Sequence, residues 1–395
     1  MARKGLLACL LGVAWGQALP VRGDGGFFVI EGEVQSLAQT RQEVLLAIHG
    51  DPAGEGQEVT YVLRTQYDGN PNEFAWVIPV PATPSDVVAH ETGRLFEALN
   101  EQTHPLFLVF TGRGSPGWGC ACVGGTAGGS LEDTLVEVEA SGQAGIFAWA
   151  ALTSTGSEAL LTWLEENGFN VPAEARGVLD GYIQQGMHFL ALRINKPQEV
   201  AGNGPIEIPP IQFTCRTAQR VYPMAISQIS AAAATEVLIY VLANHHAEAA
   251  NVPNAVISPE AVALEPDSPS YSNYEALFAG KIAELGGLAL ITEFASSSFE
   301  LDSVWSEAPA GALAATFLTR MRTVISPEQM TLDFAFQDAA SDQEVSAQFW
   351  LGSSSRVQAA LISGQPLGAL LVFALLWSIM RRCSHRCGYR VHPSR

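Results

Sequence analysis

One stretch near the C-terminus, residues 357–380, contains no charged side chain, and it constrains this chain more than any other feature. A helix needs about 20 residues to cross the hydrocarbon core of a bilayer, and this stretch is long enough. Arg381 and Arg382 follow it directly, and basic residues beside a span stay on the cytoplasmic side. The pattern predicts one transmembrane helix at 357–380, a basic cytoplasmic tail at 381–395, and a body outside the cytoplasm.

Two alternatives remain for this apolar stretch. A buried core helix would also lack charges, but a basic tail does not usually follow such a helix. A short terminal span with a basic cluster is also similar to the sorting tails of some bacterial surface proteins, which a protease removes. In that case the body would be released or transferred to another carrier.

Residues 1–23 have the parts of a secretory signal peptide. Two basic residues precede an apolar run at 6–15, which is too short to span a bilayer. Small residues offer cleavage points after Ala18 or after Gly23. We therefore predict that the chain is exported and that 1–23 is removed; an uncleaved N-terminal anchor is the alternative.

The formal net charge of −19 is unevenly distributed along the chain. All 40 acidic residues lie between Asp24 and Glu344, whereas eight of the 21 basic residues lie outside 24–356. The range 24–356 thus holds 13 basic residues against 40 acidic ones, a formal charge of −27. Such a surface repels phosphate backbones, so we predict no nucleic-acid partner. Solubility is the simplest role for this charge, and gathering cations at the cell surface is the alternative.

The apolar patterning of the body favours an α+β fold with mixed or antiparallel sheets and a few packed helices. Runs rich in β-branched residues predict strands, and apolar stripes spaced three and four residues apart predict helices. Glycine marks the ends of three helical patterns, at Gly168, Gly186 and Gly286. We predict strands at 43–50, 58–66, 74–80, 106–110, 134–140, 145–152, 188–194, 206–214, 236–242 and 330–336, and helices at 92–103, 155–167, 172–185 and 274–285.

A glycine-rich segment at 112–130 divides the body. It separates a β-rich N-terminal part, 24–111, from an α+β remainder, 131–345. The segment lacks the Lys-Ser/Thr ending of a phosphate-binding loop, so it predicts a loop or linker. Its Trp118 is the best candidate for an exposed aromatic side chain that contacts a ligand.

Three of the six cysteines lie in the predicted extracytoplasmic body: Cys120, Cys122 and Cys215. Cys120 and Cys122 are separated by one residue, which makes a disulfide between them strained. Either of them is a candidate to pair with Cys215. Their spacing does not supply the further ligands that a metal site would need.

The sequence contains no motif that identifies an active site. It lacks the G-x-S-x-G elbow of many serine hydrolases and the H-E-x-x-H motif of zinc proteases. His245 and His246 are the only adjacent histidines, and neighbouring side chains on a strand point to opposite faces. Cys122 paired with His104 or His188 as a nucleophile and base is a weak alternative. We predict no catalytic, cofactor-binding or metal-binding residues and no cofactor.

Several stretches follow one another through the body: DGGFF at 24–28, EFAWVIPVP at 73–81, LFEALNEQTHPLF at 95–107, GIFAWAAL at 145–152, ALLTWLEENGF at 159–169, IPPIQF and RVYPMAIS within 208–227, and LTRMRTVISPEQMTLDFAF at 318–336. Together they resemble a bacterial family of exported proteins, domain of unknown function 2330. The resemblance implies an exported and often membrane-tethered protein, and it implies no activity. Many members begin with cysteine where this chain has Asp24, so lipid attachment at that point is not available here.

These features together predict a membrane-anchored extracytoplasmic protein with no enzymatic activity. Its body would act as a structural component of the envelope or bind an envelope protein or glycan. An extracytoplasmic hydrolase without a recognisable motif is the first alternative. A receptor-like sensor is the second, but the tail at 381–395 is too short for a cytosolic signalling domain.

Overall fold

The computed structural model describes the greater part of the body. The predicted signal peptide, the glycine-rich segment and the predicted transmembrane helix with its tail lie outside the described residues. No helix among the described residues is both long and apolar enough to cross a membrane. The described residues are 26–29, 38–50, 56–68, 73–109, 137–169, 175–195, 206–265, 268–309 and 311–351.

The described residues fall into two compact units. The first comprises those within 26–106 and 137–349, and it contains both large sheets and all four α-helices. The second comprises 107–109 and 350–351.

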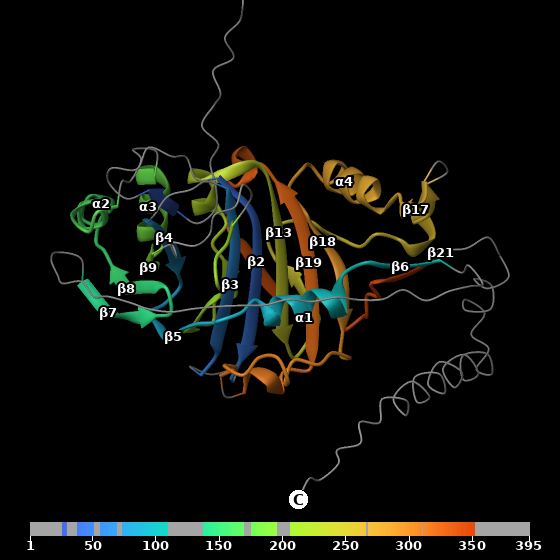
Figure 1. Ribbon diagram of the computed structural model, residues 1–395, viewed down its shortest axis with the longest axis horizontal. Coiled ribbons are helices and arrows are strands. Elements are labelled where there is room, and N and C mark those ends of the chain that lie inside the picture. Colours follow the sequence, from blue (N-terminus) through green and yellow to red (C-terminus); the bar gives the residue numbers. More distant parts are fainter. Residues whose placement is uncertain are drawn as a thin grey trace, which may run out of the picture. The chain divides into compact units, whose positions relative to one another are not determined.

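A nine-stranded mixed sheet forms the centre of the first unit (Figure 1). Its pairs are antiparallel except for two parallel pairs, β2 with β13 and β15 with β18. The strands, in spatial order, are β15 (Asn254–Ala255), β18 (Leu290–Ser296), β19 (Phe317–Ile325), β13 (Ala231–Ala243), β2 (Ala38–His49), β3 (Glu58–Asp68), β11 (Ile211–Arg216) and β5 (Pro84–Ala89), with β10 (Ile206–Glu207) also paired to β3.

A second, five-stranded sheet is antiparallel throughout. Its strands, in order, are β1 (Gly26–Val29), β4 (Glu73–Val80), β9 (His188–Asn195), β8 (Phe147–Thr153) and β7 (Glu137–Ala144). Together the two sheets confirm the α+β class with mixed and antiparallel sheets.

The main core lies between the two sheets, where apolar side chains of both form one buried cluster. Val44 and Leu46 of β2 belong to this cluster together with Trp76 and Ile78 of β4. Side chains alternate between the two faces of a strand, so the next residue after Val44, Leu45, lies on the outer face. Leu45 is also buried, because helix α1 (Arg94–Thr103) packs there (Figure 1).

Helices also cover the outer face of the five-stranded sheet. Leu160 of α2 (Ser157–Glu166) and Leu179 of α3 (Ala175–Gln184) share a buried cluster with Val77 of β4.

The remaining elements are α4 (Tyr274–Glu284), the three-stranded sheet β12 (Val221–Tyr222), β20 (Phe334–Asp338) and β14 (Ala247–Ala249), the pairs β16 (Leu264–Glu265) with β17 (Ser268–Ser272) and β6 (Leu106–Val109) with β21 (Gln348–Leu351), and the 3₁₀ turns η1 (Ala225–Ile229), η2 (Pro259–Ala261), η3 (Ala312–Ala314) and η4 (Pro327–Gln329).

Candidate functional site

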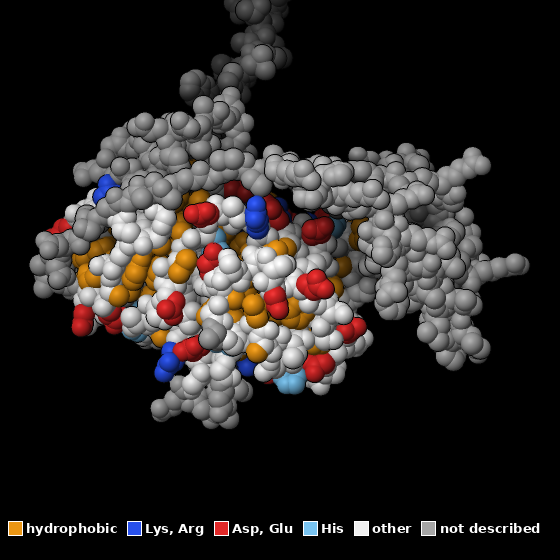
Figure 2. All heavy atoms as spheres, turned by 60° about the horizontal axis from the view of Figure 1, so that its bottom comes forward, with side chains coloured by type: hydrophobic (Ala, Val, Ile, Leu, Met, Phe, Trp, Pro, Cys, Tyr) orange, Lys and Arg blue, Asp and Glu red, His pale blue; other side chains and the backbone are white. Residues whose placement is uncertain are grey.

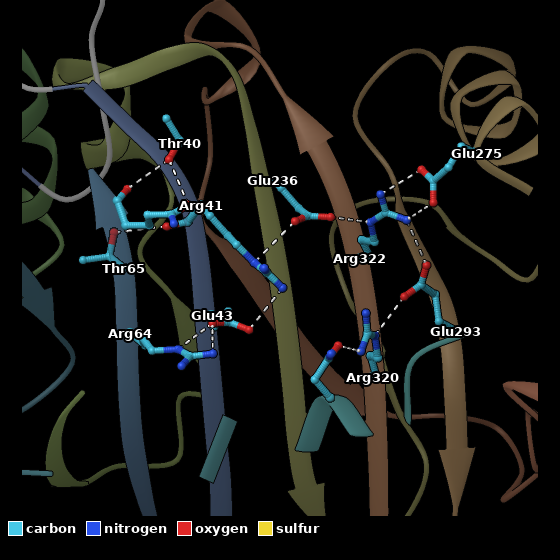
Figure 3. Close-up of polar contacts among 12 residues, drawn as sticks. Thr40, Arg41, Glu43, Arg64, Thr65, Glu236, Glu275, Glu293, Arg320 and Arg322 are labelled. Carbon is cyan, nitrogen blue, oxygen red and sulfur yellow. Dashed lines mark hydrogen bonds and ion pairs between the residues drawn. The ribbon is translucent and has the colours of Figure 1, made fainter. Parts of the chain in front are cut away.

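Charged side chains cross the outer face of the nine-stranded sheet beside α1 and α4 (Figure 3). Strand register brings the first of them together, because Glu43 of β2 lies opposite Arg64 of β3, and Arg41 lies opposite Glu236 of β13. Opposite charges at directly facing positions stabilise a sheet. We call the whole set the charge array; its members are Arg41, Glu43, Arg64, Glu236, Glu275, Glu293, Arg320 and Arg322.

The part of the array on β2 and β3 is centred on Glu43, whose side chain is almost fully buried. Arg64 donates through Nε to Glu43 Oε2 at 2.6 Å, and Arg41 donates through Nη2 to Glu43 Oε1 at 3.3 Å. Arg41 Nε lies 3.4 Å from Glu236 Oε2 as an ion pair, although it makes no hydrogen bond there. Arg41 therefore links Glu43 on its own strand to Glu236 on the neighbouring strand.

Arg322 of β19 continues the array to helix α4. Its Nε donates to Glu236 Oε1 at 2.8 Å, and its two Nη atoms donate to the carboxylate of Glu275 at 2.8 and 2.9 Å. The guanidinium also stacks over the ring of Phe278, 4.2 Å from its centroid. Burial lowers the pKa of Arg322, but the surrounding glutamates outweigh burial, so that the pKa is raised overall. This two-pronged contact ties α4 to the sheet.

The most deeply buried pair of the array joins Arg320 of β19 to Glu293 of β18. Arg320 Nε donates to Glu293 Oε2 at 2.8 Å, and the two side chains are 5% and 0% exposed. Arg320 also donates to Asn100 Oδ1 of α1 at 2.8 Å, and the Tyr274 hydroxyl of α4 donates to Glu293 Oε1 at 3.1 Å. Burial raises the pKa of Tyr274, and the adjacent Glu293 raises it further. The pair therefore connects two strands and two helices.

The array holds four arginines and four glutamates, so it is formally neutral. Every carboxylate faces at least one guanidinium, and arginine stays protonated at all relevant pH values. Such a set offers no unpaired base for proton transfer. It is open to solvent at its centre and at one end: the side chains of Arg41 and Glu236 are 35% and 30% exposed, and that of Glu275 is 68% exposed. This open part can contact a partner through charges of both signs.

A second set of polar side chains on the same face has the order carboxylate, imidazole, hydroxyl that is found in hydrolase triads. Glu58 Oε2 lies 3.8 Å from His49 Nδ1, His49 Nε2 lies 2.9 Å from Thr60 Oγ1, and Thr60 Oγ1 lies 2.9 Å from Thr214 Oγ1. Burial lowers the pKa of His49, and Glu58 only partly offsets this. The Thr60 side chain is fully buried, so its hydroxyl lies out of reach of a substrate.

A third set of polar side chains holds the loop after β18 against the sheet through hydrogen bonds. Gln212 of β11 accepts from the indole of Trp305 at 2.8 Å, and its Oε1 lies 3.1 Å from His90 Nε2. The Gln212 amide donates to the Glu307 carbonyl at 2.8 Å. Burial lowers the pKa of His90, against the opposing effect of the Glu307 carboxylate. This group has a structural explanation that requires no ligand.

The residues singled out from the sequence do not converge on one place. His245 pairs with Asp342 at 3.0 Å, whereas the ring of His246 stacks on Phe317. His104 follows α1 and contacts the carbonyl of Asn100 in that helix. His188 lies on β9, 3.0 Å from Glu139 of β7. Among the described residues, no group of three or more His, Cys, Asp or Glu side chains could hold a metal ion.

Cys215 of β11 carries a buried free thiol. Its Sγ donates to the carbonyl of Ala82 at 3.4 Å, and burial raises the pKa of the thiol to about 12. The other candidates for the disulfide, Cys120 and Cys122, lie outside the described residues, as do Trp118, Arg381 and Arg382. The disulfide and the ligand contact at Trp118 therefore stay predictions.

The charge array was not found from the sequence. Its members are dispersed between Arg41 and Arg322, and only the register of distant strands brings them together. The available signal was the recurrence of charged residues inside strongly apolar strands, as at Arg320 and Arg322 within FLTRMRTVI.

Comparison with known proteins agrees with the resemblance drawn from the sequence. The model of a family described as an uncharacterised protein conserved in bacteria, DUF2330, matches residues 20–337. No curated protein and no solved structure is significantly similar to the chain. Because the match covers most of the chain, the chain belongs to the DUF2330 family.

Proposed function

We propose that this protein is exported and membrane-anchored, and that its body binds another component of the cell envelope without catalysing a reaction. The apolar run after the basic start and the uncharged stretch at 357–380 support export and anchoring. Arg381 and Arg382 support a cytoplasmic C-terminus, with the body outside.

The charge array is the observation that carries the binding function. Seven of its eight side chains lie on strands of a large sheet and Glu275 lies on helix α4, and ion pairs link these side chains to one another. Binding groups held on rigid elements are positioned more accurately than groups on loops. Because the open part of the array presents Arg41, Glu236 and Glu275 together, it favours a partner with complementary charges of both signs.

A protein is the partner class that fits these charges best. Acidic side chains are spread over the face shown in Figure 2, with few basic ones between them, and this surface repels polyanions. A neutral glycan could hydrogen-bond to the array, but it would not use the alternation of charges. We therefore favour an envelope protein, with a glycan as the other outcome of the test.

Co-purification from solubilised membranes tests this proposal with two matched variants. Arg41→Gln removes the most open guanidinium of the array, while Glu43 keeps Arg64 and Glu236 keeps Arg322. Arg216→Gln makes the same change on β11, outside the array, where the side chain is 73% exposed. We expect the partner captured by the parent chain to be lost with Arg41→Gln and kept with Arg216→Gln.

Two outcomes would contradict the proposal. One is capture that is unchanged by Arg41→Gln in a chain with the parent circular-dichroism spectrum. The other is robust hydrolysis of a simple ester, phosphate or peptide that a single side-chain change abolishes, which would favour the hydrolase alternative.

The orientation is tested separately by protease treatment of intact spheroplasts. If the body lies outside the cytoplasm, the added protease digests it before lysis. A body that survives until the cells are lysed would refute the proposed topology.

A further inference from the structure

The pair of strands β6 and β21 exposes large apolar side chains at the end of the described chain. The two strands run side by side (Figure 1). Leu106 of β6 is 41% exposed and Trp350 of β21 is 50% exposed. Among the described residues, Val256 is the only other large hydrophobic side chain with comparable exposure. An exposed tryptophan needs an explanation, because burial of a ring this large is strongly favourable.

Strand β21 is held in place by its buried neighbours. Phe349 is buried, and its ring lies 5.3 Å from that of Tyr274 in α4. Ala347 accepts a backbone hydrogen bond from Leu106 at 2.7 Å. Because side chains alternate along a strand, the burial of Phe349 directs Trp350 to the opposite side.

The chain itself limits how far Trp350 can lie from the predicted transmembrane helix. Only residues 352–356 separate the end of β21 at Leu351 from the start of the uncharged stretch at Val357. Fully extended, this connector spans at most about 20 Å. If the uncharged stretch crosses the bilayer, Trp350 is held within about 25 Å of the membrane surface.

The charge pattern near Trp350 also changes as the chain approaches this surface. No acidic residue follows Glu344, and residues 345–355 carry no charge at all. The first charged residue after Glu344 is the basic Arg356. The segment that bears Trp350 therefore lacks the acidic residues that would repel anionic lipid head groups.

We propose that Trp350 of β21 inserts into the head-group region of the outer leaflet and holds the end of this strand at the membrane. Tryptophan favours this region because its ring is apolar and its indole N–H can hydrogen-bond. The proposal rests on the membrane anchoring proposed above. It adds a second membrane contact, made by strand β21 just before the predicted span.

Tryptophan fluorescence of the full chain in phosphatidylcholine liposomes tests this inference. The lipids are used either unmodified or brominated near the top of the acyl chains, so that bromine quenches only tryptophans at the interface. The emission of Trp350 is taken as the difference between the parent chain and Trp350→Phe. Trp149→Phe, on the half-buried Trp149 of β8, serves as the matched control.

We expect the Trp350 difference emission to lose most of its intensity in brominated lipid, and the Trp149 difference emission to be unchanged. Equal Trp350 difference emission in both lipids would overturn the inference, while flotation of the chain with the liposomes would leave the anchoring intact. A chain that does not float with the liposomes would overturn the anchoring and this inference together.

Discussion

At one end of strand β2, the two faces of the nine-stranded sheet differ in whether their polar side chains have partners. On the outer face, every charge of the array has an oppositely charged neighbour. On the inner face, Gln39 and Gln42 lie opposite Tyr67 and Thr65, two residues apart on β3, so both amides face the core. Both amide atoms of Gln39 and the Nε2 of Gln42 are buried without a hydrogen-bond partner.

This difference follows from the free-energy cost of burying a polar group without a partner. An ionised side chain without a partner costs so much in a protein interior that it changes protonation state or finds a partner. A neutral amide without a partner costs about 1–3 kcal/mol by protein mutational data, which a large core can tolerate. The outer charges are therefore fixed by their ion pairs, whereas the inner amides lower the stability of the fold, and substitution can remove this cost.

The largest effect is expected from breaking the most deeply buried pair. Arg320→Met leaves Glu293 with the Tyr274 hydroxyl and the longer hydrogen bond from Arg322 Nη1 at 3.4 Å. We expect a loss of about 3 kcal/mol in the free energy of unfolding, because the buried Glu293 carboxylate loses its closest counter-ion. Urea unfolding of the full chain in detergent micelles measures it.

The double variant Arg320→Met with Glu293→Leu is the control for this prediction. Replacing both members of a buried pair by apolar residues of similar volume is often neutral or stabilising. We expect the double variant to be more stable than the single one. A single variant that loses less than about 1 kcal/mol would show that the pair is not as isolated from water as its burial indicates.

The next prediction concerns the inner face, where we expect a substitution to raise the free energy of unfolding. Gln39→Met keeps the side-chain length and removes two buried polar atoms that have no partner. We expect a gain of about 1–2 kcal/mol in the free energy of unfolding, measured in the same way. Gln57→Met is the matched control, because the Gln57 amide donates to the Thr217 carbonyl at 3.1 Å. That variant should lose about 1 kcal/mol. A loss with Gln39→Met would indicate that ordered water satisfies the amide.

The sequence predicted the fold class and many elements because the signals for these are local. Gly168, Gly186 and Gly286 were predicted to end helices, and each has a positive φ just after the helix. Strands β18 and β19 were missed. Both faces of β19 are buried, and Arg320 and Arg322 interrupt its apolar run, so no simple alternation marks it as a strand.

The charge array could not be predicted because its contacts are distant in sequence. Arg320 and Asn100 are 220 residues apart, and Arg322 and Glu236 are 86 apart. These contacts depend on which strands pair and in which register, and a single sequence does not specify the pairing of distant strands. The bulge between Thr292 and Phe294 adds to this, because it changes the register of β18 against β19 next to Glu293.

A smaller loss of folding stability is expected when the pH falls. Burial lowers the pKa of His49, His90 and His246 below the ordinary value of 6.5. In this range the unfolded chain binds more protons than the folded one, so the stability contributed by these neutral histidines is present above about pH 6.5 and is lost as the pH falls towards their folded pKa values. Unfolding midpoints between pH 7.5 and pH 5 measure this loss.

His90→Gln should reduce this pH dependence, because glutamine does not titrate and can still reach Gln212. His245→Gln is the control: its pairing with Asp342 raises the pKa of His245, so the variant should not reduce the loss at low pH. A His90→Gln chain with the full pH dependence of the parent would assign the effect to other groups.

The smallest change in the free energy of unfolding is expected when a solvent-exposed ion pair is broken. Lys281 and Glu284 lie three residues apart on α4, with an Nζ to Oε2 distance of 2.9 Å and side chains that are 32% and 65% exposed. Lys281→Gln keeps the helix propensity and should lose only about 0.2–0.5 kcal/mol in the free energy of unfolding, a loss that added salt should remove. The distance resembles that of Arg320 and Glu293, so burial is the variable that separates the two pairs. If Lys281→Gln cost as much as Arg320→Met, distance rather than burial would set the energy of an ion pair here, and the contrast between the charged face and the amide-lined core would lose its physical basis.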